Sequence, residues 1–295
     1  MEIESFLHYI EFEKRYSLHT RDSYRRDLLQ FNTYLLEVYS VDNPNDVNDQ
    51  MLRNWLAELM DQGLTAKTVN RKLSTLRSYF RFLLRQSKVT LNPVVKIQGP
   101  KIKKRLPAFV EERKMDLLYS IDIDYSDFVE VRTALIVDML YSTGIRRAEL
   151  IGLKINDVDE KKGQIKVLGK RKKERIVPVG ERLLKLYRAF LLLREEKLTE
   201  GEDSSYVFLT KNGKKIYPKV VYRAVNYYLS TVSTQEKKSP HVLRHTFATH
   251  MLNNGADLNA VKELLGHASL AATQIYTHNT IEKLKKVYQQ AHPKA

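Results

Sequence analysis

The stretch SPHVLRHTFATH, residues 239–250, concentrates side chains that could do chemistry. It holds three histidines and one arginine, namely His241, Arg244, His245 and His250. Three interpretations compete for it: a metal site, a phosphate-binding site, and a helix that is simply rich in histidine. The chain has no cysteine. Thiolate nucleophiles and cysteine-ligated zinc are therefore excluded.

The metal site is the weakest interpretation. His241 and His245 are four residues apart and would share one face of a helix, as in HExxH zinc sites. Position 242 is Val, where such a site needs a glutamate as general base. The nearest acidic residues in the sequence are Glu236 and Asp257, one on each side. We therefore expect no metal here.

The phosphate-binding interpretation depends on the helix that carries the stretch. Ser239 and Pro240 mark a helix start, which places His241 and Arg244 three residues apart near its beginning. An arginine offers a planar fork of donors that matches phosphate oxygens, and a histidine donates or accepts a proton at neutral pH. A lone HxxR pair is usually structural, so the interpretation needs further residues.

Four other residues could complete a phosphate site: Arg146 in TGIRRAEL, Lys170 in LGKRKK, His267 in LLGHAS and Tyr276 in ATQIYTHN. Each has a structural alternative. Arg146 could pair with Glu149 on its own helix, and Lys170 could be a turn lysine. His267 could cap a helix that ends at Gly266, and Tyr276 could be a core tyrosine.

Taken together, these residues resemble the active-site set of the tyrosine recombinase (phage integrase) family. The strings TGIRRAELIGL, LGKRKKERIVPVG, SPHVLRHTFATHML and ELLGHASLAATQIYTH are similar to its Xer-type members, and the resemblance covers nearly the whole chain. Two small departures are Arg147, where a hydrophobic residue is commoner, and the KRKK turn, which lacks a glycine. Neither departure removes a catalytic group.

The resemblance implies DNA strand exchange without a cofactor. Tyr276 would attack a phosphodiester and form a 3′-phosphotyrosine link, releasing a 5′ hydroxyl. A tyrosine has an ordinary pKa of about 10, so it needs a base, and His241 is the expected one. Lys170 would be the general acid that protonates the leaving 5′ oxygen.

The remaining catalytic groups would stabilise charge. Arg146, Arg244 and His267 would donate hydrogen bonds to the non-bridging oxygens as charge builds up on them. Fixed donors of this kind replace the metal that many nucleases use. His245 and His250 are expected to be structural.

The resemblance also implies a mainly α fold with a small antiparallel β-sheet. It predicts a helical, SAM-like core-binding domain over residues 1–92, a basic linker over 93–107, and a catalytic domain over 108–295 that ends in an exchange helix. The apolar pattern predicts the elements in between. They are helices over 17–36 (with Thr20 as N-cap), 50–60, 63–86, 181–196, 220–232, from 241 onward, 258–266 and 281–291, and a hairpin over 163–180 around Lys170.

The charge of the chain points to a polyanionic partner. Fifty lysines and arginines oppose 35 acidic residues, which gives a net charge of +15 and a pI near 9.6. No acidic residue stands between Asp61 and Glu111, and a one-signed helix face repels itself unless an anion neutralises it. We expect contacts with the phosphates of DNA from Lys67, Arg71, Lys72, Arg77, Arg81, Arg85, Lys103 and Lys104.

The expected setting is a cytoplasmic chain that acts on double-stranded DNA and not on a membrane. The start, MEIESF, does not read as a signal peptide, and the longest aliphatic cluster, residues 189–193, is too short to span a bilayer. The resemblance implies a recombinase tetramer on two DNA sites. It leaves open a second, related recombinase, a DNA translocase as activator, and whether the last helix docks in cis or in trans.

Several functions share this chemistry or this scaffold. Resolution of chromosome dimers at cell division is the first expectation, because the chain starts directly at the core-binding pattern. An integrase of a mobile element would use the same chemistry on a different target. A catalytically idle DNA-binding protein would not need the intact set of six groups. A topoisomerase-like enzyme would relax supercoils without exchanging partners.

Overall fold

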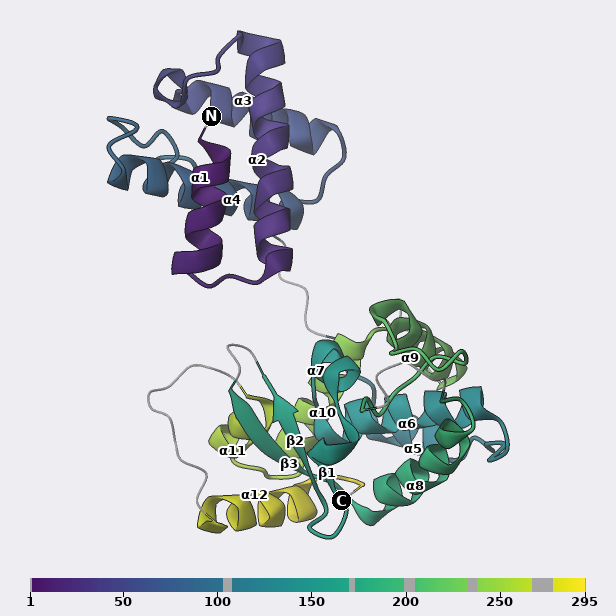
Figure 1. Ribbon diagram of the computed structural model, residues 1–295. Helices are drawn as coiled ribbons and strands as arrows, with labels where there is room; N and C mark the ends of the chain where they lie inside the picture. Colours follow the sequence, from purple (N-terminus) through teal and green to yellow (C-terminus); the bar gives the residue numbers. More distant parts are fainter. Residues whose placement is uncertain are drawn as a thin grey trace. The chain divides into compact units, whose positions relative to one another are not determined.

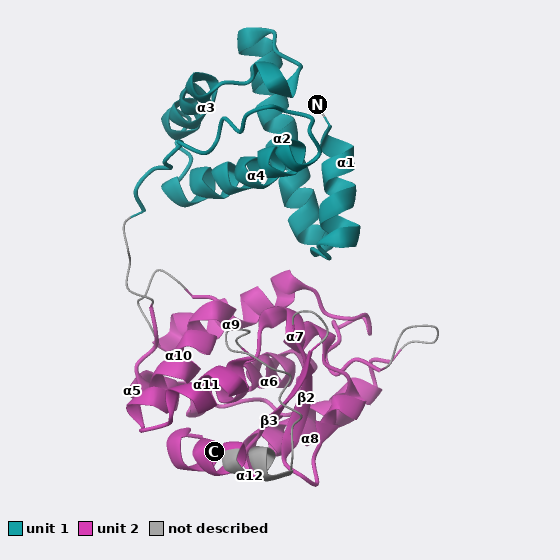
Figure 2. Ribbon diagram, turned by 90° about the vertical axis from the view of Figure 1, so that its left-hand side faces the viewer, with its two compact units in different colours: residues 1–105 teal, residues 106–295 magenta. Residues whose placement is uncertain are grey.

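The computed structural model describes residues 2–102, 108–169, 173–198, 205–232, 238–266 and 278–294. The chain divides into two compact units, Met1–Arg105 and Leu106–Ala295 (Figure 2). Helices dominate both units, and the second also holds a three-stranded antiparallel sheet. The predicted fold class, mainly α with a small antiparallel sheet, is confirmed.

The first unit is a helical domain with its own core (Figure 1). Its apolar centre includes Phe31 and Trp55, whose rings lie 4.8 Å apart. The long α4 buries one apolar stripe and exposes a polar one, as the sequence pattern predicts. The helices are α1 (Ile3–His8), α2 (Leu18–Tyr39), α3 (Asp49–Asp61) and α4 (Ala66–Arg85), with shorter helical turns at Tyr9–Glu13 and Pro44–Asp46.

Helix α2 begins earlier than its predicted cap. Its N-cap is Ser17, whose side-chain oxygen accepts a hydrogen bond from the backbone N–H of Thr20 at 3.3 Å. The prediction of Thr20 as N-cap is therefore wrong by three residues. Either hydroxyl satisfies the sequence rule for a cap, but only Ser17 has the extended backbone that the position requires.

A buried ion-pair cluster joins α2 to α4. Asp27 is 1% exposed and accepts hydrogen bonds from Lys72 at 3.0 Å, from the Thr75 hydroxyl at 3.0 Å, and from Arg71. The Lys72 ammonium also contacts Gln30 at 2.5 Å. Lys72 was expected to contact DNA, yet its side chain is only 9% exposed. Its ammonium neutralises the buried Asp27 inside the first unit. We therefore do not include Lys72 in the DNA-binding surface.

The beginning of the expected linker packs on the first unit. Val94 and Ile97 are buried in its core. Arg77 donates to the carbonyl of Ile97 at 2.6 Å, and the amide of Asn70 donates to the carbonyl of Pro100 at 2.7 Å. Residues 92–100 thus follow the surface of α4. Lys103 and Lys104 lie outside the described residues.

The second unit is built around α6 (Phe128–Thr143), which is buried on nearly all sides. It packs against α8 (Glu181–Glu195), α9 (Pro218–Val232) and α10 (Pro240–Asn253) (Figure 1). A helix that is buried on nearly all sides belongs in the middle of a domain. The unit also contains α5 (Glu112–Tyr119), α7 (Arg147–Gly152), α11 (Leu258–Leu265) and α12 (His278–Ala291).

The sheet of the second unit has the order β1-β2-β3, with strands at Val158–Asp159, Gln164–Leu168 and Glu174–Pro178. The register of β2 and β3 pairs Val167 with Arg175 and Leu168 with Glu174. The hairpin predicted over residues 163–180 is therefore confirmed. Lys170, which comes between these strands in the sequence, lies outside the described residues.

Helix α12 packs in cis, on the unit to which it belongs. It contacts α10, α11 and β3, and Leu284, Tyr288 and Ala291 are part of the unit's core. His292, just after the helix, is 5% exposed and stacks on Tyr288 with ring centroids 5.0 Å apart. Among the two dockings that the sequence left open, the single chain adopts the one in cis.

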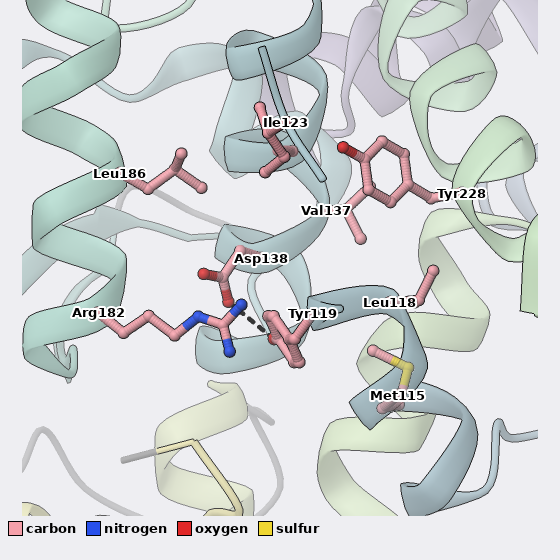
Figure 3. A pocket seen from close by; sticks show the side chains of 10 residues that line it. Met115, Leu118, Tyr119, Ile123, Val137, Asp138, Arg182, Leu186 and Tyr228 are labelled. Atoms are coloured by element: carbon pink, nitrogen blue, oxygen red, sulfur yellow. Dashed lines mark hydrogen bonds between the residues drawn. The ribbon is translucent and has the colours of Figure 1, made fainter. Parts of the chain in front are cut away.

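A small pocket opens elsewhere in this unit, between α5, α6, α8 and α9 (Figure 3). Asp138 lies within it and accepts hydrogen bonds from the hydroxyls of Tyr119 at 2.8 Å and Ser142 at 2.7 Å. Burial raises the pKa of Asp138, so the pocket favours its neutral form. The described lining residues include neither Arg146 nor Arg244.

In the described part of the chain, no helix combines the length and hydropathy that crossing a bilayer requires.

Candidate active site

Arg146 stands at a sharp corner between α6 and α7. Helix α6 ends at Thr143, and Gly144 follows with φ of +61°, in the left-handed region that favours glycine. A Cβ atom at Gly144 would lie 2.5 Å from the Phe247 ring, so the corner also packs too tightly for a side chain. Arg146 then takes an extended backbone as the N-cap of α7. The TGIR string encodes this corner.

The Arg146 side chain is held from two directions. Its Nη1 donates to Glu149 Oε1 at 2.8 Å, and its Nη2 donates to the carbonyl of Gly266 at 3.3 Å. Its backbone N–H also donates to Glu149 Oε2 at 2.8 Å. The Arg146 side chain remains 34% exposed. The pairing with Glu149 therefore orients a group that still reaches solvent.

Arg244 lies on α10, which begins at Pro240 as the sequence predicts. Its Nη2 donates to the carbonyl of Leu265 at 2.7 Å, and its Nη1 donates to the carbonyl of Gly144. Burial, together with the positive charge of Arg146, lowers the pKa of Arg244 to about 10. At neutral pH the group is still cationic, so two positive charges face one site.

Helix α11 supplies the point at which the two arginines meet. Asp257 caps its N-terminus by accepting from the N–H groups of Asn259 and Ala260. Its C-terminus ends at Leu265, and Gly266 follows with φ of +65°. The carbonyls of Leu265 and Gly266 carry the partial negative charge of a helix end. These two carbonyls therefore stabilise the guanidinium groups of Arg146 and Arg244, which the sequence analysis assigned to one site.

Glu149 and Arg175 form a buried pair beneath this site. Arg175 is 4% exposed and binds both carboxylate oxygens of Glu149, at 3.0 and 2.8 Å. Burial alone would raise the pKa of Glu149. The hydrogen bonds and charge of Arg175, helped by Arg146, lower it below the ordinary value instead. The carboxylate is thus charged at neutral pH.

Sequence reasoning missed Arg175. It named Glu149 only as a structural partner of Arg146. A signal was present, because Arg175 alternates with Ile176 in a strand and shares the buried face with Val177. A charged residue on the inward face of a strand requires a partner, and that partner here is a carboxylate.

The histidines of residues 239–250 have different environments. His241 is exposed on the first turn of α10, three residues before Arg244. His245 is half-buried. His250 is buried; its Nδ1 pairs with the Tyr141 hydroxyl and its Nε2 with the carbonyl of Val110, both at 2.9 Å. Burial lowers the pKa of His250, as suits a neutral core residue.

Three of the predicted catalytic residues, Lys170, His267 and Tyr276, lie outside the described residues. The structure therefore brings together Arg146 and Arg244, and it places His241 on the helix that carries Arg244. Gly169 and Gly266, which directly precede Lys170 and His267 in the sequence, are described. No group of three or more histidine, aspartate or glutamate side chains suited to a metal ion is present among the described residues.

The basic surface expected to bind DNA lies on α4. Lys67, Arg71, Arg77, Arg81 and Arg85 are exposed. Several have local partners: Arg71 contacts Ser23 as well as Asp27, and Arg85 lies 4.4 Å above the Tyr9 ring. Lys67 and Arg81 make no hydrogen bond or ion pair with the described residues, which leaves both charges available to an anionic partner.

Comparison with known proteins assigns both units. The model of the phage integrase family matches residues 108–283, and the model of the phage integrase N-terminal SAM-like domain matches residues 3–87. Tyrosine recombinase XerC from Chlorobaculum parvum is 37% identical over 317 residues, which cover 99% of this chain and 94% of that protein. Tyrosine recombinase XerD from Staphylococcus haemolyticus is 35% identical over 294 residues, 99% of each chain.

Solved structures agree on the fold. A structure of the XerH site-specific recombinase bound to palindromic difH substrate superposes with a TM-score of 0.72 at 24% identity, covering 92% of this chain and 79% of that chain. The Tn1549 transposon integrase in complex with circular intermediate DNA gives a TM-score of 0.70 at 20% identity, covering 95% and 97%. From the family models and the full-length relatives, the chain belongs to the phage integrase family of tyrosine recombinases.

Proposed function

We propose that this chain is a site-specific recombinase of the Xer type, which cuts and rejoins double-stranded DNA through a 3′-phosphotyrosine intermediate. The observation that carries the proposal is the convergence of Arg146 and Arg244 on consecutive carbonyls at the end of α11. Two fixed guanidinium groups facing one point suit a phosphate whose non-bridging oxygens gain charge during attack. The full-length relatives named XerC and XerD support resolution of chromosome dimers, in the cytoplasm, as the biological role that we propose.

In this proposal the guanidinium groups act before any proton moves. A phosphodiester carries a negative charge that repels an anionic nucleophile. Arg146 and Arg244 neutralise that charge, and His267, directly after Gly266 in the chain, supplies a third donor. The donors are preorganised by the protein, because Glu149 and the carbonyls at the end of α11 hold the arginines in place without DNA.

The proton transfers belong to three other residues. His241, exposed at the start of α10, accepts the proton of the Tyr276 hydroxyl as that oxygen attacks phosphorus. Lys170 donates a proton to the leaving 5′ oxygen. The phosphotyrosine ester keeps the energy of the broken bond, so the 5′ hydroxyl of a partner strand rejoins the DNA by attacking it. No nucleotide cofactor is consumed.

Binding involves both units and more than one chain. Lys67 and Arg81 of α4 contact the DNA backbone, and four recombinase chains assemble on two recombination sites. A second, related recombinase and a DNA translocase that activates the complex complete the proposed set of partners. On DNA, α12 would leave the cis packing of the single chain for a neighbouring recombinase.

The test is the capture of the covalent intermediate. Nicked duplexes that carry candidate chromosomal recombination sites are incubated with the protein in EDTA and run on a denaturing gel. We expect a covalent protein–DNA band that Tyr276→Phe abolishes while DNA binding is retained. Tyr227→Phe is the matched control, because Tyr227 is a tyrosine of α9 that is 65% exposed. Adduct formation by the Tyr276→Phe chain would exclude Tyr276 as the nucleophile.

A further inference from the structure

We infer that Arg175 is a positioning residue, which holds Arg146 and the backbone segments next to Lys170 and His267 in their catalytic arrangement. This inference rests on the proposed function and deepens it. It starts from the position of Arg175 on β3, where the side chain is 4% exposed and points into the unit. Because the side chain is buried, its role must come from the residues that it contacts inside the unit.

The first contact reaches Arg146 through a shared carboxylate. Arg175 binds Oε1 and Oε2 of Glu149, and Arg146 binds the same Oε1 with its side chain and Oε2 with its backbone. Glu149 therefore lies between an arginine that is buried and one that is exposed. A carboxylate clamped by a bidentate arginine has a fixed plane, and that plane sets the direction of the Arg146 guanidinium.

The second contact reaches the end of α11. Arg175 Nε donates to the carbonyl of Leu264 at 2.8 Å. A Cβ atom at Gly266 would lie 3.1 Å from Arg175 Cδ and 3.2 Å from its Nη1, so the guanidinium packs directly on this backbone. The residue after Gly266 is His267. Arg175 thus supports the helix end on which Arg146 and Arg244 converge.

The third contact reaches the hairpin. A Cβ atom at Gly169 would lie 3.4 Å from Arg175 Nη1 and 3.6 Å from Glu149 Oε1. Gly169 also closes the turn by donating to the carbonyl of Lys173 at 2.7 Å. The residue after Gly169 is Lys170. One buried guanidinium therefore contacts the backbone beside two proposed catalytic residues and the carboxylate that orients a third.

The test compares Arg175→Lys with the unaltered chain in single-turnover cleavage of the nicked duplex on which the unaltered chain forms its adduct. Lysine keeps the positive charge but cannot bind both oxygens of Glu149 and the Leu264 carbonyl together. We expect the cleavage rate to fall about tenfold or more, since a displaced donor at a charged transition state commonly costs that much. An unchanged rate would refute the inference.

Three versions of the scissile phosphate separate positioning from general destabilisation. The first is the natural phosphodiester. The second is a neutral methylphosphonate, which has less negative charge for Arg146 to neutralise. The third has a bridging 5′ sulfur, which leaves without the proton of Lys170. We expect the rate loss of Arg175→Lys to shrink on at least one altered substrate. A loss by the same factor on all three would mean that Arg175 only stabilises the fold, because a misfolded fraction lowers every rate equally.

Arg194→Lys is the matched control. Arg194 is 2% exposed in the same unit and donates to the carbonyls of Tyr206 and Val207, away from Glu149. We expect it to lose stability but to keep the same ratio of rates on the three substrates as the unaltered chain. If the unaltered chain formed no Tyr276-dependent adduct at all, the proposed function would fail instead.

Discussion

Arg244 and Arg146 donate hydrogen bonds to consecutive carbonyls at the end of α11, Arg244 to Leu265 at 2.7 Å and Arg146 to Gly266 at 3.3 Å. Two like charges repel, so this arrangement needs compensation. It comes from the helix end and from Glu149, which is charged and bound to Arg146. The site is therefore already assembled in the chain without DNA. The two arginines differ in how much each contributes to the stability of the fold.

That difference gives the first prediction. Arg244→Ala should slow cleavage by about 100-fold or more, through lost charge stabilisation. It should also lower the free energy of unfolding by about 1–2 kcal/mol, because the side chain links the end of α6 to the end of α11. Arg146→Ala should slow cleavage similarly but cost less stability, since Glu149 keeps Arg175. Single-turnover cleavage measures the two rates, and denaturant titration measures the two free energies of unfolding. A larger loss of stability for Arg146→Ala than for Arg244→Ala would contradict this prediction.

The second prediction concerns Lys170 as general acid. Lys170→Ala should slow cleavage of an ordinary phosphodiester by about 100-fold or more. A duplex with sulfur at the bridging 5′ position should restore a rate near that of the unaltered chain, because a thiolate leaves without protonation. Lys173→Ala, in the same turn, is the control and should be normal on both substrates. If sulfur gave no recovery, Lys170 would have another role.

Local patterns in the sequence predicted the elements well and the buried charges poorly. The hairpin around Lys170 follows from turn residues and alternation, which are local signals. The pairs Lys72 with Asp27 and Arg175 with Glu149 join residues 45 and 26 positions apart. Helical spacing places Lys72 beside a basic stripe, but only the packing of α2 on α4 decides that its ammonium faces a carboxylate.

The third prediction tests α4 as the DNA-binding surface. Arg81→Ala should weaken binding to all duplexes by a similar factor and lower the slope of log affinity against log salt by about one. The reason is that one fewer phosphate is neutralised and fewer counterions are released. Gel-shift titrations over a range of salt concentrations measure the slope. Arg53→Ala, which removes an arginine of α3 paired with Asp49, should leave the slope unchanged.

The fourth prediction follows from the correction at Lys72. Lys72→Met should destabilise the first unit by about 1–3 kcal/mol, because the buried Asp27 loses one of its partners while Arg71 and Thr75 remain. The chain has a single tryptophan, Trp55, which is 2% exposed in the core of this unit. Its fluorescence therefore reports unfolding of the first unit within the whole chain. An unaltered midpoint would show that the pair contributes no net stability.

The fifth prediction is a dependence of stability on pH in the second unit. Burial lowers the pKa of His292 to about 3, against 6.5 for an ordinary histidine. Below pH 6.5 the unfolded chain takes up a proton that the folded chain refuses, so stability must fall as the solution becomes more acidic. The loss approaches about 1.4 kcal/mol for each pH unit from this one group. His250, whose pKa is also lowered by burial, acts in the same direction.

His292→Phe isolates this contribution. The ring remains against Tyr288, Tyr141 and Phe247, whose centroids lie 5.0 to 5.4 Å from that of His292, but the titrating group is gone. Urea titrations followed by far-ultraviolet circular dichroism, at pH 6.5 and pH 5.5, should show a smaller loss of stability on acidification for the variant than for the unaltered chain. Equal losses would mean that His292 is protonated in the folded state. The helix α12 would then be less firmly packed in cis than the burial of Leu284 and Tyr288 indicates.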